Sequence, residues 1–199
     1  MSGRFIALEG WEATGKSTQA AALGETLDAL VTRQPGDSSI GAKVRELVLE
    51  TDVDVTPRAE ALLFAADRAQ HVAEVVRPTL RAGRDVVCDR YLYSSVAYQG
   101  FGRGLDPAEV TRLSMWAAEG LVPDLVVLLD LPYEVAVRRL DRDRDRIERG
   151  DDGFHRRVHA AFAELAAAEP HRWAVIDADA APDEVTARIM EVIHDRLGG

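Results

Sequence analysis

Short, unbroken runs of apolar residues mark the places where buried strands are expected. The longest lie within residues 5–8, 85–89 and 124–130. Continuous apolar runs of this length are typical of parallel strands that helices cover on both faces of a sheet. Shorter runs at 29–32 and 172–177 predict a second and a last strand. The pattern therefore predicts five strands in a mostly parallel sheet.

Helical periodicity fills the intervals between these runs, most clearly within residues 58–76. Apolar side chains recur there at spacings of three and four, which predicts an amphipathic helix. Pro78 is expected to kink or end this helix. The apolar stripe consists of Ala59, Leu62, Leu63, Ala66, Ala69, Ala73 and Val76.

The remaining helices follow from caps and periodicity. Asp106 and Pro107 are typical of an N-cap and a first helical position, and they predict a helix to about residue 119. Strands that alternate with helices indicate an α/β fold. Further helices are expected at about 16–29, 40–50, 133–140, 154–168 and 182–197.

Length and charge narrow the class of protein. A chain of 199 residues corresponds to one domain, 1–199. The net charge of −10 argues against non-specific binding to nucleic acid or to an anionic membrane. With one cysteine, Cys88, no intramolecular disulfide can form, and no apolar stretch approaches the ~20 residues that span a bilayer. We therefore expect a cytoplasmic protein that binds neither nucleic acid nor membrane.

The strongest chemical signal is a glycine-rich segment between the first strand and the first helix. It begins at Gly10 and ends in Gly15-Lys16-Ser17, which fits the phosphate-binding pattern G-x-x-x-x-G-K-[ST] in its required context. Such a loop turns backbone N–H groups towards phosphate oxygens, and the following helix directs its positive end to the same place. Lys16 is expected to bridge the β- and γ-phosphates, and the Ser17 hydroxyl to bind Mg²⁺.

A second set of motifs follows the phosphate-binding loop along the chain. Thr32-Arg33-Gln34-Pro35-Gly36 forms a turn motif, a helix carries Phe64 to His71, and Asp89-Arg90-Tyr91 leads into Ser95, Ala97, Tyr98 and Gln99. An Asp130-Leu-Pro segment and the charged run at 138–149 complete the order. In this order the motifs resemble thymidylate kinase, and the resemblance covers about residues 4–195. It implies a P-loop NTP-hydrolase-like three-layer sandwich with a small lid at about 138–153.

The resemblance also implies an activity, the phosphorylation of dTMP to dTDP with ATP as donor and Mg²⁺ as cofactor, in a homodimer. The acceptor phosphate is already anionic at pH 7, so the site needs cations and positioning, and it needs no general base. Arg33 and Arg90 are expected to hold that phosphate, Phe64 to stack on thymine and Arg68 to hydrogen-bond the base. Glu12 would take the sugar 3′-hydroxyl, Tyr98 would disfavour a ribose, and Ser95 and Gln99 would line the pocket.

The donor side is assigned in the same way. Asp89 is expected to hold Mg²⁺ through water beside Ser17, and lid arginines to close over the transferred group. Which lid arginine does so is left open among Arg142, Arg144 and Arg146. The residues expected around ATP are Gly10, Trp11, Glu12, Ala13, Thr14, Gly15, Lys16, Ser17 and Thr18.

Three departures from the family pattern affect these expectations. Ala13 stands where glycine is usual, and we expect it to avoid positive φ by a slight reshaping of the loop. Gln34 and Asp37 replace an acid and a glycine of the turn, so the contacts of that turn are open. Structural roles are the competing interpretation: Phe64 and Tyr98 as core, Asp89–Arg90 as an ion pair, the charged run as a solvated face. A kinase for another nucleoside monophosphate or a nucleoside, or a regulator without turnover, is the alternative function.

Overall fold

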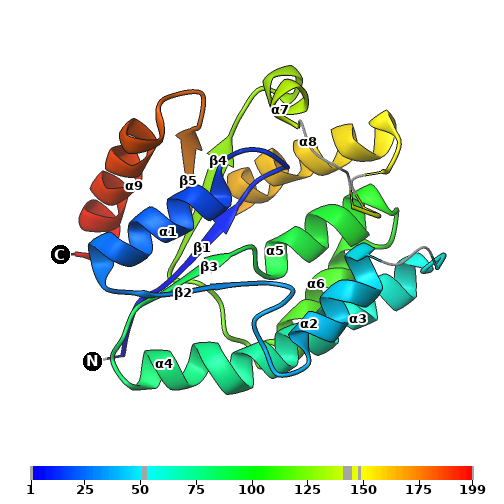
Figure 1. Ribbon diagram of the computed structural model, residues 1–199, viewed down its shortest axis with the longest axis horizontal. Coiled ribbons are helices and arrows are strands. Elements are labelled where there is room, and N and C mark those ends of the chain that lie inside the picture. The colour runs from blue at the N-terminus through cyan, green and yellow to red at the C-terminus, as the bar shows by residue number, and fades with distance from the viewer. Residues whose placement is uncertain (1, 51–52, 141–144, 148, 199) are drawn as a thin grey trace.

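A five-stranded parallel sheet forms the centre of the computed structural model, which describes residues 2–50, 53–140, 145–147 and 149–198 (Figure 1). The strand order is β2-β3-β1-β4-β5, so β1 lies at the middle of the sheet. Register pairs Ile6 with Val87 on one side and with Leu125 on the other. The strands are β1 (Phe5–Glu9), β2 (Leu30–Arg33), β3 (Val86–Asp89), β4 (Leu125–Asp130) and β5 (Trp173–Asp177). The predicted α/β sandwich with a five-stranded parallel sheet is confirmed.

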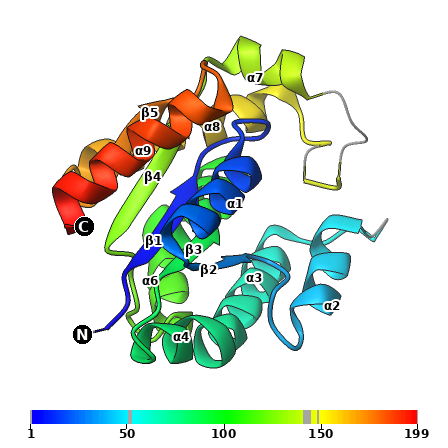
Figure 2. The ribbon, with the colours of Figure 1, turned by 60° about the vertical axis from the view of Figure 1, so that its left-hand side comes forward.

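Helices cover both faces of this sheet (Figures 1 and 2). The first and last helices, α1 (Lys16–Leu27) and α9 (Pro182–Leu197), pack side by side on one face. The other face carries α5 (Leu92–Ser95), the π-helical segment η3 (Val96–Gly102), α6 (Pro107–Ala117) and α8 (Asp152–Ala168). The apolar residues of β1, β3 and β4 are buried between the two layers, Cys88 among them as a small buried side chain, whereas Val31 of β2 and Val175 of β5 are exposed. Among the described residues, no helix is long and apolar enough to cross a bilayer.

Segment boundaries follow local backbone chemistry. The Ala108 N–H donates to Asp106 Oδ1 (2.9 Å), which confirms the predicted cap of α6. Asp28 ends α1 in the left-handed conformation, so β2 begins at Leu30 almost without a connection. The helix expected at 40–50 is divided into α2 (Gly41–Arg45) and the π-helical turn η1 (Glu46–Glu50). The helix before the charged run is α7 (Tyr133–Arg139).

Pro78 is predicted to kink or end its helix. The helix does not end there, so that part of the prediction is wrong. The chain continues from α3 (Pro57–His71) through the π-helical turn η2 (Val72–Val76) into α4 (Arg77–Arg81). Pro78 lies in the first turn of α4, directly after η2 has departed from regular α-helical bonding. Its missing N–H therefore interrupts no regular ladder, and the helical path persists for a further turn.

The face that α3 buries is also different from the predicted apolar stripe. Of that stripe, Leu62 is 59% exposed and Ala66, Ala69 and Ala73 are exposed as well. The buried face instead carries Glu60, Ala61, Ala65, Asp67, Arg68 and His71. These polar side chains meet partners from other elements, so burial here follows the hydrogen-bonding groups of a site rather than hydrophobic periodicity.

Candidate active site

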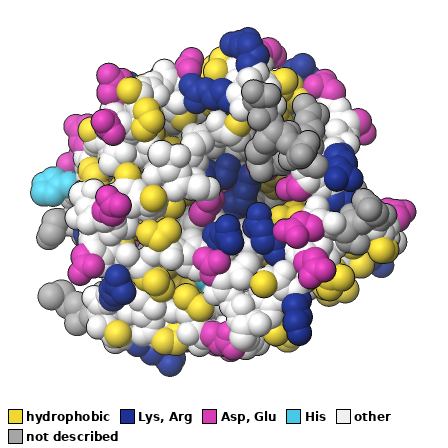
Figure 3. Space-filling model, in the orientation of Figure 1, with side chains coloured by type: hydrophobic (Ala, Val, Ile, Leu, Met, Phe, Trp, Pro, Cys, Tyr) yellow, Lys and Arg dark blue, Asp and Glu magenta, His cyan; other side chains and the backbone are white. Residues whose placement is uncertain are grey.

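A cavity of about 390 Å³ opens at the carboxyl ends of β1, β2 and β3. Ligand sites of parallel α/β sheets lie at this edge. Lysine and arginine side chains gather in the hollow that the space-filling view shows, although the chain as a whole is acidic (Figure 3). Most of the predicted site residues line it: Glu12, Ala13, Gly15, Lys16, Ser17, Thr18, Arg33, Phe64, Arg68, Asp89, Arg90, Ser95, Tyr98 and Gln99.

The glycine-rich loop leaves β1 and wraps the start of α1. Gly10 has φ 139°, and a Cβ on it would lie 2.7 Å from the Leu129 carbonyl oxygen, so a side chain has no room there. Gly15 has φ 90° at the N-cap of α1. The loop thus turns sharply under the sheet edge and directs the N-terminus of α1 into the cavity, as anion binding requires.

Ala13 adopts φ 56°, and the prediction that it avoids positive φ is wrong. The turn between Gly10 and Gly15 is fixed by the sheet edge and by the helix start. Thr14 Oγ1 also donates to the Trp11 carbonyl (3.1 Å), which closes the loop on itself. The closed loop therefore imposes the left-handed conformation on an alanine, at a cost of roughly 1–2 kcal/mol.

Lys16 lies almost fully buried beneath this loop. Its Nζ donates to the Trp11 carbonyl (2.5 Å) and to Thr14 Oγ1 (3.3 Å). Burial, and then the nearby Arg90 guanidinium, lower the pKa of Lys16 to about 8. A phosphate at the loop would reverse this effect, because an adjacent anion favours the charged ammonium.

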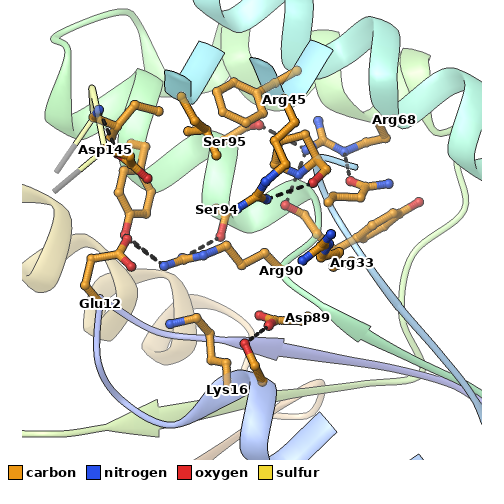
Figure 4. Close-up of a pocket in the computed structure, with 18 of the residues that line it drawn as sticks. Glu12, Lys16, Arg33, Arg45, Arg68, Asp89, Arg90, Ser94, Ser95 and Asp145 are labelled. Atoms are coloured by element: carbon orange, nitrogen blue, oxygen red, sulfur yellow. Dashed lines mark hydrogen bonds and ion pairs between the residues drawn. The ribbon is translucent and has the colours of Figure 1, made fainter. Parts of the chain in front are cut away.

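Ser17 and Asp89 meet at the mouth of the cavity, where the Ser17 hydroxyl donates to Asp89 Oδ2 (2.6 Å; Figure 4). Two hard oxygen donors suit Mg²⁺, which completes its octahedral shell with water and substrate phosphate. No group of three or more His, Cys, Asp or Glu side chains able to hold a metal occurs in the described part of the chain. The pair therefore fits a magnesium ion that is bound together with a nucleotide, rather than an all-protein metal cage.

Arg90 links the glycine-rich loop to the helical segment that carries Tyr98. It has φ 68°, and its guanidinium donates to the Gly10 carbonyl (3.0 Å). It also donates to Glu12 Oε1 (2.7 Å; Figure 4). The Tyr98 hydroxyl donates to the same Glu12 oxygen (2.5 Å), and Arg90 stacks over the Tyr98 ring. Burial and the adjacent carboxylate raise the pKa of Tyr98, so its hydroxyl stays a donor. Arg90 and Glu12 thus form an ion pair that also lines the cavity.

Arg68 lines the cavity, and neutral groups accept all the hydrogen bonds described for its guanidinium. Its Nε donates to Gln34 Oε1 (3.1 Å), and its other nitrogens donate to Ser114 Oγ, Ser95 Oγ and the Tyr91 carbonyl. It makes no ion pair with Asp67 or Glu60 among the described contacts. Gln34, where the family pattern has an acid, also contacts His71 Nδ1 (2.8 Å).

Two residues were not found from the sequence: one lines the cavity, and the other is buried in contact with the lining residue Gln34. His71 is fully buried, with Nε2 2.7 Å from Thr32 Oγ1, and burial lowers its pKa to about 4, so it is neutral. Arg45 extends from α2 into the cavity and donates to the Pro35 carbonyl (3.1 Å; Figure 4). An arginine within a short helix gives no sequence signal until the turn around Pro35 is folded beside it.

The turn of Arg33 is held by one of the departures from the family pattern. Asp37 Oδ2 accepts from the Arg33 backbone N–H (3.0 Å), and Asp37 Oδ1 lies 3.3 Å from Arg33 Nε. Asp37 therefore closes the turn and orients an arginine whose side chain is half exposed at the cavity.

The charged run is only partly described. Arg142 and Arg144 lie outside the described residues. Arg146 does not line the cavity: its Nε donates to the Val48 carbonyl (2.8 Å) and its terminal nitrogen to Glu60. The lid and its catalytic arginine stay predictions.

Trp11 does not face the cavity either. It is buried beside the loop, with its ring centroid 4.9 Å from Tyr133 and 5.5 Å from His155. The bulky residue thereby packs the loop against α7 and α8.

Taken together, a glycine-rich loop, a serine–aspartate pair at the strand ends and an arginine-lined second half define a P-loop nucleotide kinase. The family model described as thymidylate kinase matches residues 8–189. A thymidylate kinase of Clavibacter sepedonicus is 53% identical over 98% of this chain and 96% of that protein, and one of Bifidobacterium longum is 48% identical over 98% and 99%. The crystal structure of thymidylate kinase from Ehrlichia chaffeensis superposes with a TM-score of 0.81 at 26% identity, covering 97% of this chain and all of that one. The chain belongs to the thymidylate kinase family, and the predicted resemblance is confirmed.

Proposed function

We infer that this protein transfers the γ-phosphoryl group of ATP to dTMP and forms dTDP and ADP. The observation that carries this inference is the division of one cavity into two halves. The loop around Lys16 offers one phosphate-binding half, and Arg33, Arg45 and Arg90 surround the other. Two polyanions can thus be held side by side in one enclosure, as phosphoryl transfer between nucleotides requires.

The second half of the cavity would also hold the base of the acceptor nucleotide, and we call this part the base half. Its side chains fit thymine. Gln99 Oε1 is a buried acceptor without a hydrogen-bond partner among the described residues. Arg68 donates four hydrogen bonds to protein groups, and a guanidinium has five N–H groups. Thymine offers an N–H donor at N3 beside a carbonyl acceptor at O4. Cytosine offers an acceptor at N3 and an amino donor at position 4. An acceptor would then face Gln99 Oε1, and a donor would face the Arg68 guanidinium. Phe64 lines the same half with an apolar ring and is proposed to stack on the base.

Charge neutralisation is the chemical task. A dTMP phosphate oxygen attacks the γ-phosphorus as the bond to the β–γ bridging oxygen breaks, and the electron pair leaves with ADP. Arg33, Arg45 and Arg90 are proposed to orient the acceptor, and Lys16 to stabilise the charge between the β- and γ-phosphates. Mg²⁺ held by Ser17, and by Asp89 through water, supplies further positive charge when bound.

We also propose that two copies associate through α3 and α6. Among the described residues, Trp116 on α6 is 79% exposed and Leu62 on α3 is 59% exposed, on packed neighbouring helices. Exposed large apolar side chains beside a stripe of alanines are typical of an association surface. We expect Trp116→Glu to shift the mass measured by light scattering from dimer to monomer. A native dimer that survives the change, or a native monomer, would contradict this interface.

The decisive experiment for the activity is product formation with Mg-ATP and a panel of acceptors: dTMP, dUMP, dCMP, dGMP, UMP and thymidine. We expect dTDP to dominate. Turnover of another acceptor would keep the loop assignment and reject the assignment of the base half. ATP binding without any turnover would favour a nucleotide-binding regulator.

A further inference from the structure

Glu60 is a fully buried carboxylate on α3 that does not line the cavity. Its Oε1 accepts from Gln99 Nε2 (3.0 Å) and from Arg103 Nε (3.2 Å). Its Oε2 accepts from a terminal nitrogen of Arg103 (3.2 Å) and from Arg146. Two guanidinium groups thus compensate the charge that a buried carboxylate brings into the protein.

This cluster fixes the orientation of the Gln99 side-chain amide. Guanidinium groups only donate, so the Glu60 oxygens that face them must accept. The end of the Gln99 amide that faces Glu60 must therefore be the NH₂ group, and the carbonyl oxygen must point the other way. The opposite amide orientation would place two acceptors together.

The orientation has a consequence in the cavity. Gln99 lines it, and Gln99 Oε1 is the one buried side-chain polar atom without a hydrogen-bond partner among the described cavity-lining residues. A buried acceptor in a native structure is nearly always satisfied, so this oxygen requires a donor from a bound ligand.

We propose that Glu60 is a positioning residue for base recognition: it fixes the Gln99 amide so that an acceptor faces the base, and thereby selects a base with an N–H donor. This inference rests on the proposed function, because it concerns which end of the Gln99 amide meets N3–H of a bound thymine. Glu60 acts through Gln99 and touches no substrate.

The test compares wild type, Glu60→Gln and Glu60→Gln/Gln99→Glu for kcat and KM with dTMP, dCMP and ATP. An amide at position 60 can turn either way, so Gln99 loses its fixed orientation. We expect the KM for dTMP to rise about tenfold and the dTMP-over-dCMP preference in kcat/KM to fall by a similar factor. The KM for ATP should stay at the wild-type value, since the loop around Lys16 lies in the other half of the cavity.

The double variant separates orientation from folding. It keeps one carboxylate within the cluster, and a glutamate at position 99 presents an acceptor to the cavity whichever way it turns. We expect it to restore the KM for dTMP to within about threefold of wild type, whereas a purely structural role of Glu60 predicts no such rescue. The matched control is Glu74→Gln, an exposed carboxylate that also accepts from a glutamine amide, that of Gln70, and that we expect to leave all constants unchanged.

Each outcome decides between the hypotheses. An unchanged KM and base preference in folded Glu60→Gln would overturn the proposal, as would a folded double variant without rescue. If Glu60→Gln does not fold, the double variant alone decides. Absence of dTMP turnover in wild type would instead reject the proposed function.

Discussion

Acidification should destabilise this protein through one buried histidine. His71 is fully buried, and burial lowers its pKa from 6.5 to about 4, a larger effect than that of nearby Asp37, which raises it, or of Arg68, which lowers it further. The unfolded chain therefore binds a proton near pH 6.5 that the folded chain binds only near pH 4. The stability that the neutral imidazole provides is complete above about pH 6.5 and is lost as the pH falls towards 4.

The magnitude follows from the shift. Each pH unit in this window is worth about 1.4 kcal/mol, so the free energy of unfolding should fall by about 3 kcal/mol between pH 7.5 and pH 4 because of His71 alone. Asp67 and Glu9 have pKa values raised by burial, so their protonation in acid stabilises the fold and partly masks this loss. A difference between two variants removes that contribution.

The assay is urea unfolding at 25 °C at several pH values from 7.5 to 4, for wild type and for His71→Gln. A glutamine can keep hydrogen bonds to Thr32 and Gln34, and it does not titrate. We expect the variant to have a lower free energy of unfolding than wild type at pH 7.5. As the pH falls to 4, the difference between the two free energies should change by about 3 kcal/mol in favour of the variant. Parallel curves for the two proteins would refute the reasoning, because the acid sensitivity would then come from other groups.

Four further outcomes are expected. Since the pKa of Lys16 is about 8 in the free protein, ATP binding at pH 8 should take up about half a proton, measured by calorimetry in buffers of different ionisation enthalpy; binding without proton uptake would contradict the assigned environment. Ala13→Gly should raise the free energy of unfolding by about 0.5–1 kcal/mol in urea titrations, because φ 56° suits glycine, and a loss of stability would refute the strain argument. Phe64→Ala should mainly raise the KM for dTMP at least tenfold, whereas Lys16→Ala should mainly lower kcat; equal full activity of either variant would reject its assignment.

The sequence predicted the sheet and the phosphate loop because both depend on local patterns. Continuous apolar runs define strands buried on both faces, and the loop requires glycine, lysine and serine at fixed spacing within a strand-to-helix turn. Five strands and most helices accordingly lie within one or two residues of the predicted bounds.

The errors arose where tertiary contacts override a local rule. The apolar stripe of α3 faces outward because the opposite face carries Arg68, which lines the cavity, and the buried His71 and Glu60. Hydrophobic periodicity cannot show a helix that buries charge. Ala13 adopts a conformation that only its closed loop imposes. Arg45 and Glu60 contact residues outside any local motif of their own, Pro35 and Arg103, so no motif containing either one could reveal these contacts.

The three tryptophans lie in environments that give the protein built-in optical probes. Trp11 is 3% exposed beside the phosphate loop, Trp173 is 2% exposed in the sheet, and Trp116 is 79% exposed on α6. An aqueous collisional quencher should therefore extinguish the emission of Trp116 and leave the other two nearly untouched. Emission that survives the quencher then reports on the packing around the loop, and the accessible fraction reports on whether the α6 surface is covered, so one unlabelled sample can follow both events.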